Sequence, residues 1–267
     1  MTVQAIRGVV ESAIQQASKA TGVDFGFLLG AARRESGYNP GAKAHTSSAA
    51  GLFQFVEQTW LATLKRHGAK YGYGQFAEAI SQGADGRYHV ADKARQAVMD
   101  LRLDPHAASL MAGELASDHA SYLRGRVGRD PTAGELYAAH FLGPQASAKL
   151  IEAVQTRPGA SAAALFPEAA AANHAVFHRD GRTVTVAELY HKLGEVGSGS
   201  AAPADPDPPG YVHDAAALGR IQQAEQERAI LELVLRGPES PDSGGGSLGG
   251  SMFSTEMLKL LSDARRS

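Results

Sequence analysis

Hydrophobic residues recur every three or four positions along most of the chain, which is the spacing of one face of an α-helix. The first such stripe is formed by Val3, Ile6, Val10 and Ile14 and predicts an amphipathic helix over residues 2–18. Similar spacing continues to about residue 194, and strand signals are few. Residues 182–186 are the one run of strand type, and we expect a loop there. The pattern predicts an all-α fold, or an α fold with a minimal β element.

Capping signals set the ends of several predicted helices. Asp24 is suited to begin a helix that runs to Ser36, and Gly37 is placed to end it. Two Asp-Pro pairs put a capping residue before a proline of the first helical turn. The remaining expected features are a loop over 38–48, a helix through Trp60 that stops at Gly68, irregular passages at 71–74 and 85–86, helices starting at Asp104-Pro105 and Asp130-Pro131, the second ending at Gly143-Pro144, helices over 145–155 and 161–177, a turn at Asp180-Gly181 and a helix from the Thr185–Glu188 capping box to Leu193.

The composition changes after residue 194. Residues 197–210 are almost entirely Gly, Ser, Ala, Pro and Asp, which is typical of a flexible linker that cannot form a core. Short amphipathic helices are expected near 213–235 and 252–264, with a second Gly- and Ser-rich linker between them. We therefore predict a folded domain over residues 1–195 and a linker-rich, flexible tail over 196–267.

Composition and charge exclude several classes of function. Of the 267 residues, 26 are Lys or Arg and 28 are Asp or Glu, and the net charge of −2 argues against a nucleic-acid-binding protein. With no cysteine, the chain has no disulfides, no thiol catalysis and no thiolate metal site. No apolar run reaches the roughly 18 residues of a membrane span. The N-terminus lacks the features of a secretory signal, so a protein acting outside the cytoplasm would leave by another route or have lost its leader.

Glu35 is the first candidate for chemistry. It follows Leu28 by seven residues and Ala31 and Ala32 by four and three, which places its carboxyl on the apolar stripe of the predicted helix. It also lies in the last helical turn, where the helix dipole disfavours negative charge. Burial and the dipole both raise the pKa of a carboxyl, as a general acid near neutral pH requires. A solvated Glu at a helix end is the alternative interpretation of this pattern.

Three motifs follow one another in a recognisable order. Glu35-Ser36 precedes Tyr38-Asn39-Pro40, then Ser48-Ala-Ala-Gly-Leu-Phe-Gln54, and finally Ala139-His-Phe-Leu-Gly-Pro144. This ordered set resembles the catalytic core of the soluble SLT type of lytic transglycosylases, which is similar to glycoside hydrolase family 23 and has a lysozyme-like fold. The resemblance spans roughly residues 22–150. It implies a lysozyme-like helical domain followed by the tail.

The resemblance implies roles for individual residues. Glu35 is the expected single catalytic acid/base, and Ser36 would orient it or contact substrate. Gly51 would let a sugar approach the main chain, and Gln54 would hydrogen-bond an N-acetyl or hydroxyl group or, equally, tie down its own loop. The expected substrate-binding residues are Ser36, Tyr38, Ser48, Gly51, Leu52, Phe53, Gln54, Tyr137, His140 and Phe141.

The third motif departs from the family pattern. His140 stands where the family usually has Tyr, and Phe141 where it usually has Asn. Three alternatives follow for the contact to the catalytic carboxyl: His140 is the donor, Tyr137 reaches in from one turn earlier, or the contact is absent. No cofactor and no metal are expected, because His174 and His178 have no third ligand placed beside them.

The implied reaction cleaves the β-1,4 bond between N-acetylmuramic acid and N-acetylglucosamine in peptidoglycan and leaves 1,6-anhydromuramic acid ends. A muramidase that hydrolyses the same bond is one alternative and would need a second carboxylate, for which Glu57 and Asp85 are candidates. A non-catalytic wall-binding or assembly protein is another. The substrate implies the periplasm or cell wall. We expect the tail to dock a secretion or flagellar partner, a solvated or swapped tail being the alternative.

Overall fold

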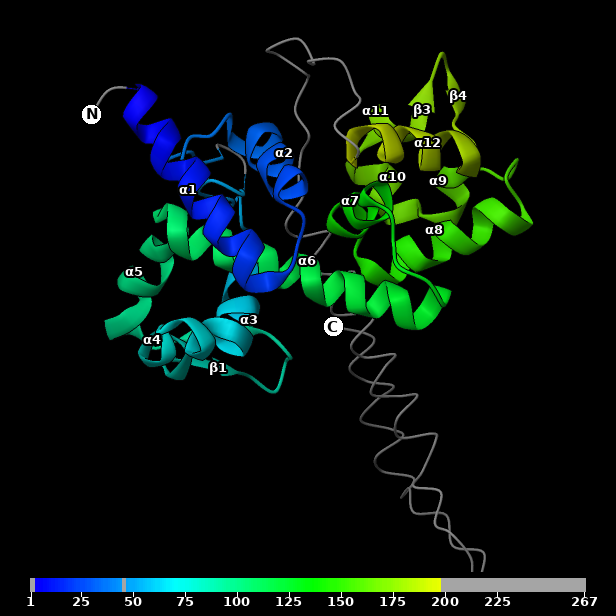
Figure 1. Ribbon diagram of the computed structural model, residues 1–267. Helices are drawn as coiled ribbons and strands as arrows, with labels where there is room; N and C mark the ends of the chain where they lie inside the picture. The colour runs from blue at the N-terminus through cyan, green and yellow to red at the C-terminus, as the bar shows by residue number, and fades with distance from the viewer. Residues whose placement is uncertain (1–2, 45–46, 198–267) are drawn as a thin grey trace, which may run out of the picture. The chain divides into compact units, whose positions relative to one another are not determined.

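The computed structural model describes residues 3–44 and 47–197, which belong to one compact unit (Figure 1). This part of the chain is mostly helical, which confirms the predicted fold class. None of its helices combines the length and the apolar character that crossing a membrane requires. The predicted tail helices near 213–235 and 252–264, and the linkers around them, lie outside the described residues.

The elements follow in this order: α1 (Val3–Thr21), α2 (Phe25–Ser36), α3 (Glu57–His67), the 3₁₀ turn η1 (Gly68–Tyr71), α4 (Gly74–Glu78), β1 (Ile80–Gln82), β2 (Tyr88–Val90), α5 (Asp92–Asp100), η2 (Leu101–Leu103), α6 (Pro105–Val127), α7 (Ala133–Leu142), α8 (Pro144–Thr156), α9 (Ala162–Leu165), α10 (Pro167–Ala172), α11 (His174–Phe177), β3 (His178–Arg179), β4 (Arg182–Thr183) and α12 (Val186–Gly197).

Helix α7 begins later than predicted. The start expected at Asp130-Pro131 is wrong, because the N-cap is Thr132. The Thr132 hydroxyl accepts a hydrogen bond from the Glu135 amide at 3.2 Å, and the Glu135 carboxylate accepts one from the Thr132 amide at 2.8 Å. This capping box satisfies two amides at once, which a lone Asp-Pro start does not do. The caps predicted at Asp24, Asp104 and Thr185 are confirmed.

The single helix expected over 161–177 is also wrong, because three short helices stand there. Pro167 has no amide hydrogen and disfavours a helical residue before it, so Phe166 leaves the helix with φ −132°. Asn173 leaves it again with the same φ before α11. The second interruption has no proline, and only the backbone angles mark it.

Two small hairpins supply the β structure. The turn predicted at Asp180-Gly181 is confirmed, and both residues have positive φ, 52° and 75°, as a tight hairpin turn requires. Arg182–Thr183 pairs with His178–Arg179, so the loop expected over 182–186 is in part a strand. The hairpin of β1 and β2 was not predicted. Its strands have three residues each, too short for a clear alternating pattern.

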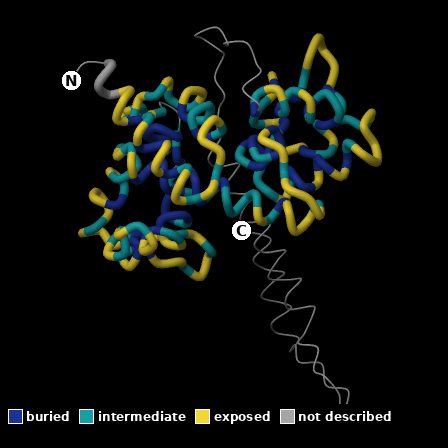
Figure 2. The backbone as a smooth tube through the Cα atoms, in the orientation of Figure 1, coloured by how far each residue is buried: buried dark blue, intermediate teal, exposed yellow. Residues whose placement is uncertain are grey.

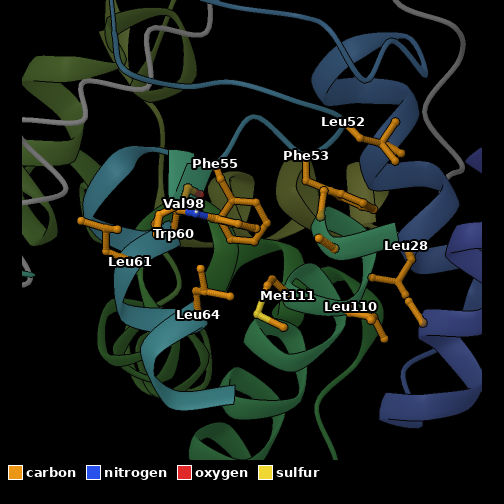
Figure 3. Close-up of a cluster of buried hydrophobic side chains, with 14 of the residues drawn as sticks. Leu28, Leu52, Phe53, Phe55, Trp60, Leu61, Leu64, Val98, Leu110 and Met111 are labelled. Carbon is orange, nitrogen blue, oxygen red and sulfur yellow. Dashed lines mark hydrogen bonds between the residues drawn. The ribbon is translucent and has the colours of Figure 1, made fainter. Parts of the chain in front are cut away.

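Two main hydrophobic clusters form the core, and buried residues line the inward faces of the helices (Figure 2). The first gathers side chains of α1, α2, α3 and α6 around Trp60, which is fully buried as predicted and donates a hydrogen bond from Nε1 to the Val98 carbonyl at 2.9 Å (Figure 3). The second gathers α7 to α12 around Phe177 and Leu189. Phe27 of α2 packs against both clusters, so α2 lies where they meet.

A buried ion pair fixes the start of α7. The Glu135 side chain is 1% exposed and accepts hydrogen bonds from Arg129 at 2.6 and 2.8 Å and from the Tyr190 hydroxyl at 2.8 Å. Burial opposes ionisation, but these donors and the Thr132 amide outweigh it and hold the pKa of Glu135 below its ordinary value of 4.5. The carboxylate therefore stabilises the fold above about pH 4.5, and this contribution is lost as the pH falls.

We predict that Glu135→Gln lowers the free energy of unfolding at pH 7 by about 3 kcal/mol, because it removes the charge that pairs with Arg129 and replaces one of the two acceptor oxygens by an NH₂ donor. The deficit relative to the wild type should shrink below about pH 4.5, where the wild-type carboxylate is itself neutralised. Urea unfolding at pH 7 and at acidic pH measures both. Glu188→Gln is the control. Glu188 also pairs with a Thr and an Arg, here Thr185 and Arg182, but its side chain is 35% exposed against 1% for Glu135. Equal losses in the two variants would contradict the role given to burial.

Candidate functional site

Glu35 lies in a cavity of about 100 Å³ that is bounded by α2, residues 53–56, α6 and α7. Its side chain is 8% exposed, in agreement with its predicted place on the apolar stripe. Within the described residues, Glu35 is the one carboxylate that lines this cavity. The other lining residues are mostly apolar: Phe27, Leu28, Ala31, Phe53, Gln54, Phe55, Val56, Thr59, Ala112, Leu115, Ala116, His119, Leu136, Tyr137, Ala139, His140, Gly143 and Pro144.

The end of α2 holds Glu35 in place. Gly37 adopts the left-handed conformation, with φ 59°, and its amide bonds the Arg33 carbonyl at 3.0 Å. The amide of Tyr38 bonds the Ala32 carbonyl at 3.3 Å, so the last carbonyls of the helix have partners. The helix therefore ends one residue after Glu35, and the chain turns at Gly37.

Ser36 connects this helix end to the next motif. Its hydroxyl lies 2.8 Å from the Leu52 carbonyl and 3.1 Å from the Ala32 carbonyl, and both oxygens are acceptors. The Leu52 side chain is fully buried in the first cluster and so anchors the Gly51–Gln54 motif to the core. Phe53, at 5% exposure, presents its side chain to the cavity.

The main chain of Arg102 requires a glycine at position 51. Its φ is 83°, and a Cβ atom there would overlap the carbonyl oxygen of Arg102. Main chain from a distant segment therefore occupies the side-chain position of Gly51, while the approach of a sugar to its backbone stays a prediction. The Arg102 guanidinium also donates to the carbonyls of Ser48 and Phe55, at 2.7 and 3.1 Å. Arg102 thus holds both ends of residues 48–55, and the local sequence carries no signal of it.

Two further residues of this motif are used within the fold. The Ser48 hydroxyl accepts the Glu57 amide at 3.1 Å and so supports the start of α3. Gln54 has φ 47°, and its Nε2 donates to the carbonyls of Gly51 at 2.9 Å and Ala42 at 3.3 Å. The amide nitrogen thus ties down its own loop, which was one of the two alternatives, while the side chain also lines the cavity.

The third motif meets Glu35 through His140. Its Nε2 lies 3.3 Å from Glu35 Oε1 across 105 positions of sequence, and its side chain is 35% exposed. Of the three alternatives, the one in which the contact is absent is wrong, because His140 reaches the carboxyl. Tyr137, one turn earlier, lines the same cavity. Phe141, at 5% exposure, packs in the second cluster, and Tyr38 packs against the first with Arg7 over its ring at 5.5 Å.

His119 on α6 is a cavity residue that the sequence analysis missed. Burial lowers the pKa of its imidazole to about 4, and the nearby His140 adds to this effect. His119 is therefore neutral at pH 7 and offers the cavity one hydrogen-bond donor and one acceptor without a charge. A histidine in the middle of a helix has no neighbouring motif that would have marked it.

Neither candidate for a second carboxylate reaches the cavity. Glu57 pairs with Arg95 at 2.8 and 2.9 Å on the far side of the α3 start. Asp85 lies in the connection between β1 and β2 and accepts a bond from the Arg87 amide at 3.0 Å, which lowers the pKa of Asp85. His174 and His178 stack on each other at 3.9 Å, and in the described part of the chain no third side chain completes a metal site with them.

We predict that Gly51→Ala destabilises the protein by about 3 kcal/mol, because the new methyl group displaces the Arg102 carbonyl and with it residues 48–55. Gly72→Ala is the matched control. Gly72 has nearly the same φ, 84° against 83°, but open space where its Cβ would lie, so it should cost only the conformational strain of about 1 kcal/mol. Urea unfolding of both variants measures the difference. Equal losses would show that the approach of Arg102 is not a constraint.

One comparison with known proteins identifies the domain. Residues 12–82 match the family model of the Transglycosylase SLT domain. The match includes Glu35, Ser36 and the Gly51–Gln54 motif, while α6 and α7 lie beyond it. An SLT domain supports a function of lytic transglycosylase or lysozyme-like type on peptidoglycan, and hence in the periplasm or cell wall. Residues 12–82 thus match a transglycosylase SLT domain, and the mostly helical structure is consistent with a domain of the SLT, lysozyme-like type.

Proposed function

We propose that this protein is a lytic transglycosylase that cleaves the β-1,4 bond between N-acetylmuramic acid and N-acetylglucosamine, with Glu35 as its single acid/base. The observation that carries the proposal is that Glu35 is the one carboxylate lining the cavity within the described residues. Hydrolysis by the usual mechanisms needs a second carboxylate to activate water or to act as the nucleophile. Glu57 and Asp85 are engaged elsewhere, which favours the non-hydrolytic reaction over a muramidase.

The reaction uses one proton and returns it. Protonated Glu35 gives its proton to the glycosidic oxygen as the bond to C1 of the muramic acid breaks. The resulting carboxylate then accepts the proton of the C6 hydroxyl of the same sugar, and the C6 oxygen bonds to C1. The products are a 1,6-anhydromuramic acid end and a free N-acetylglucosamine end. No water is consumed, so the apolar lining of the cavity suits the reaction by excluding it.

His140 supports this cycle from the opposite wall. With the proton on Nε2, its ring donates to Glu35 Oε1, from which it lies at 3.3 Å, and so orients the carboxyl. The amide of Gln54 and the rings of Phe53 and Tyr137 line the same cavity and are suited to an N-acetyl group and to sugar faces. The substrate that these groups fit is a peptidoglycan glycan strand.

We predict that Glu35→Gln lowers the rate of sacculus digestion at least about 100-fold, since a positioned acid/base contributes that much or more. Mass spectrometry of wild-type digests should show 1,6-anhydromuramic acid ends. Glu57→Gln, which removes a carboxylate outside the cavity, should digest at nearly the wild-type rate. Reducing muramic acid ends would make the protein a muramidase, and failure of every form to digest sacculi would favour a wall-binding protein.

We also propose that residues 196–267 dock a protein partner, such as a component of a secretion or flagellar machine. The support is in the sequence alone: amphipathic segments between flexible linkers often fold on a partner. Deletion of residues 211–267 should abolish localisation and leave digestion of isolated sacculi unchanged. Unchanged behaviour in both assays would reject this role.

A further inference from the structure

We infer that Arg34 is a positioning residue that sets the contact between Glu35 and His140. Its guanidinium joins α2, which carries the acid, to α7, which carries His140, and to α12, which packs on α7. The catalytic meaning of this inference rests on the proposed function. The geometric link between the two walls does not depend on it.

Arg34 makes two contacts outside its own helix. Its Nη1 donates to the carbonyl of Val196 at 3.0 Å, and its Cζ lies 4.9 Å from the centre of the Tyr137 ring. Val196 is in the last turn of α12, where carbonyls lack helical partners and carry partial negative charge, so a cation is well placed there. Gly30 leaves room for the guanidinium, since a Cβ atom at Gly30 would lie only 3.1 Å from Nη1.

These contacts run beside the catalytic one. Arg34 directly precedes Glu35, and Tyr137 is one turn before His140 on the same face of α7. The pairs Arg34–Tyr137 and Glu35–His140 therefore connect the same two helices at neighbouring points. A change in the first pair alters the separation of the second.

Helices α2 and α7 belong to different hydrophobic clusters. Helix α2 packs mainly on α1 and belongs to the first hydrophobic cluster, whereas α7 packs mainly on α12 and α8 in the second. Phe27 is the side chain of α2 that reaches both clusters. Helix α6 packs on α1 and α2 as well as on α7 and α8, and Arg34 adds a direct polar link between α2 and α7 beside the site.

Helix α12 is a firm anchor for Arg34. A Cβ atom on Gly134 of α7 would lie 2.5 Å from Gly194 Cα, and one on Gly197 would lie 2.5 Å from the Ala133 carbonyl. The backbones of α7 and α12 therefore touch directly and move together. Arg34 holds this pair at two points, the Val196 carbonyl and the Tyr137 ring.

The contacts of Arg34 are exposed, so their loss should change stability little. A catalytic acid displaced by an ångström can lose up to about 100-fold in rate. Arg34→Gln should therefore lower kcat on soluble glycan strands about tenfold, while KM and the unfolding midpoint stay close to wild type.

Arg33→Gln is the matched control. Arg33 is an equally exposed arginine in the same helical turn, so its replacement removes the same charge at nearly the same place. We expect its kcat and KM to stay within about twofold of wild type. Arg34→Lys keeps the charge but not the planar face, and we expect it to remain impaired. Equal kcat for Arg34→Gln and Arg33→Gln, or a loss in KM alone, would overturn the inference.

A second measurement does not need activity. The ring nitrogen chemical shifts of His140 report its contact with Glu35, and Glu35→Gln gives the reference for a changed contact. Arg34→Gln should move the His140 signals in the same direction as Glu35→Gln, and Arg33→Gln should not. If the wild type proves inactive on peptidoglycan, the proposed function fails and this shift still tests the link. Unchanged His140 signals in Arg34→Gln would refute it.

Discussion

The site depends on one close approach of main chain, that of Arg102 to Gly51. The carbonyl of Arg102 fills the space that any side chain at residue 51 would need, and its guanidinium holds the carbonyls of Ser48 and Phe55. Because this fixes residues 48–55, the Leu52 carbonyl is placed to accept the hydroxyl of Ser36, the neighbour of Glu35. Arg102 thus holds residues 48–55 and, through Leu52, the end of α2 that carries Glu35. Arg102 itself does not line the cavity.

The cavity lies between two hydrophobic clusters, and this explains its contents. Helices α2 and α7 belong to different clusters and meet through Phe27 and a few long polar side chains, while α6 packs on helices of both clusters. Glu35 and Arg34 come from one wall, and His140 and Tyr137 from the other. His119, neutral at pH 7, adds polarity without a competing charge, so a single carboxylate and its histidine partner dominate the electrostatics.

Helix α7, which carries His140, and helix α12, which packs on it, begin with the same capping arrangement. Arg129, Thr132 and Glu135 start α7, and Arg182, Thr185 and Glu188 start α12, with the same spacing and the same bonds. The Thr185–Glu188 capping box was predicted from sequence, but the Thr132–Glu135 box was not, because Asp130-Pro131 offers a competing start signal just before it. Both Asp130-Pro131 and Thr132–Glu135 are adequate local signals for a helix start. The start at Thr132 is the one that lets the buried Glu135 carboxylate accept from Arg129 and Tyr190.

Local sequence determined where most helices begin and end, the place of Glu35 on the apolar face of α2, and the order of the three motifs. These features depend on neighbours within about one helical turn, where spacing and geometry are tied together. Only the tertiary structure decided what Gly51 faces, that His140 meets Glu35, and that His119, Arg34 and Arg102 lie at or beside the same site. Those contacts join residues as far apart as 105 and 162 positions, and no local spacing encodes which distant surfaces the packed clusters will bring together.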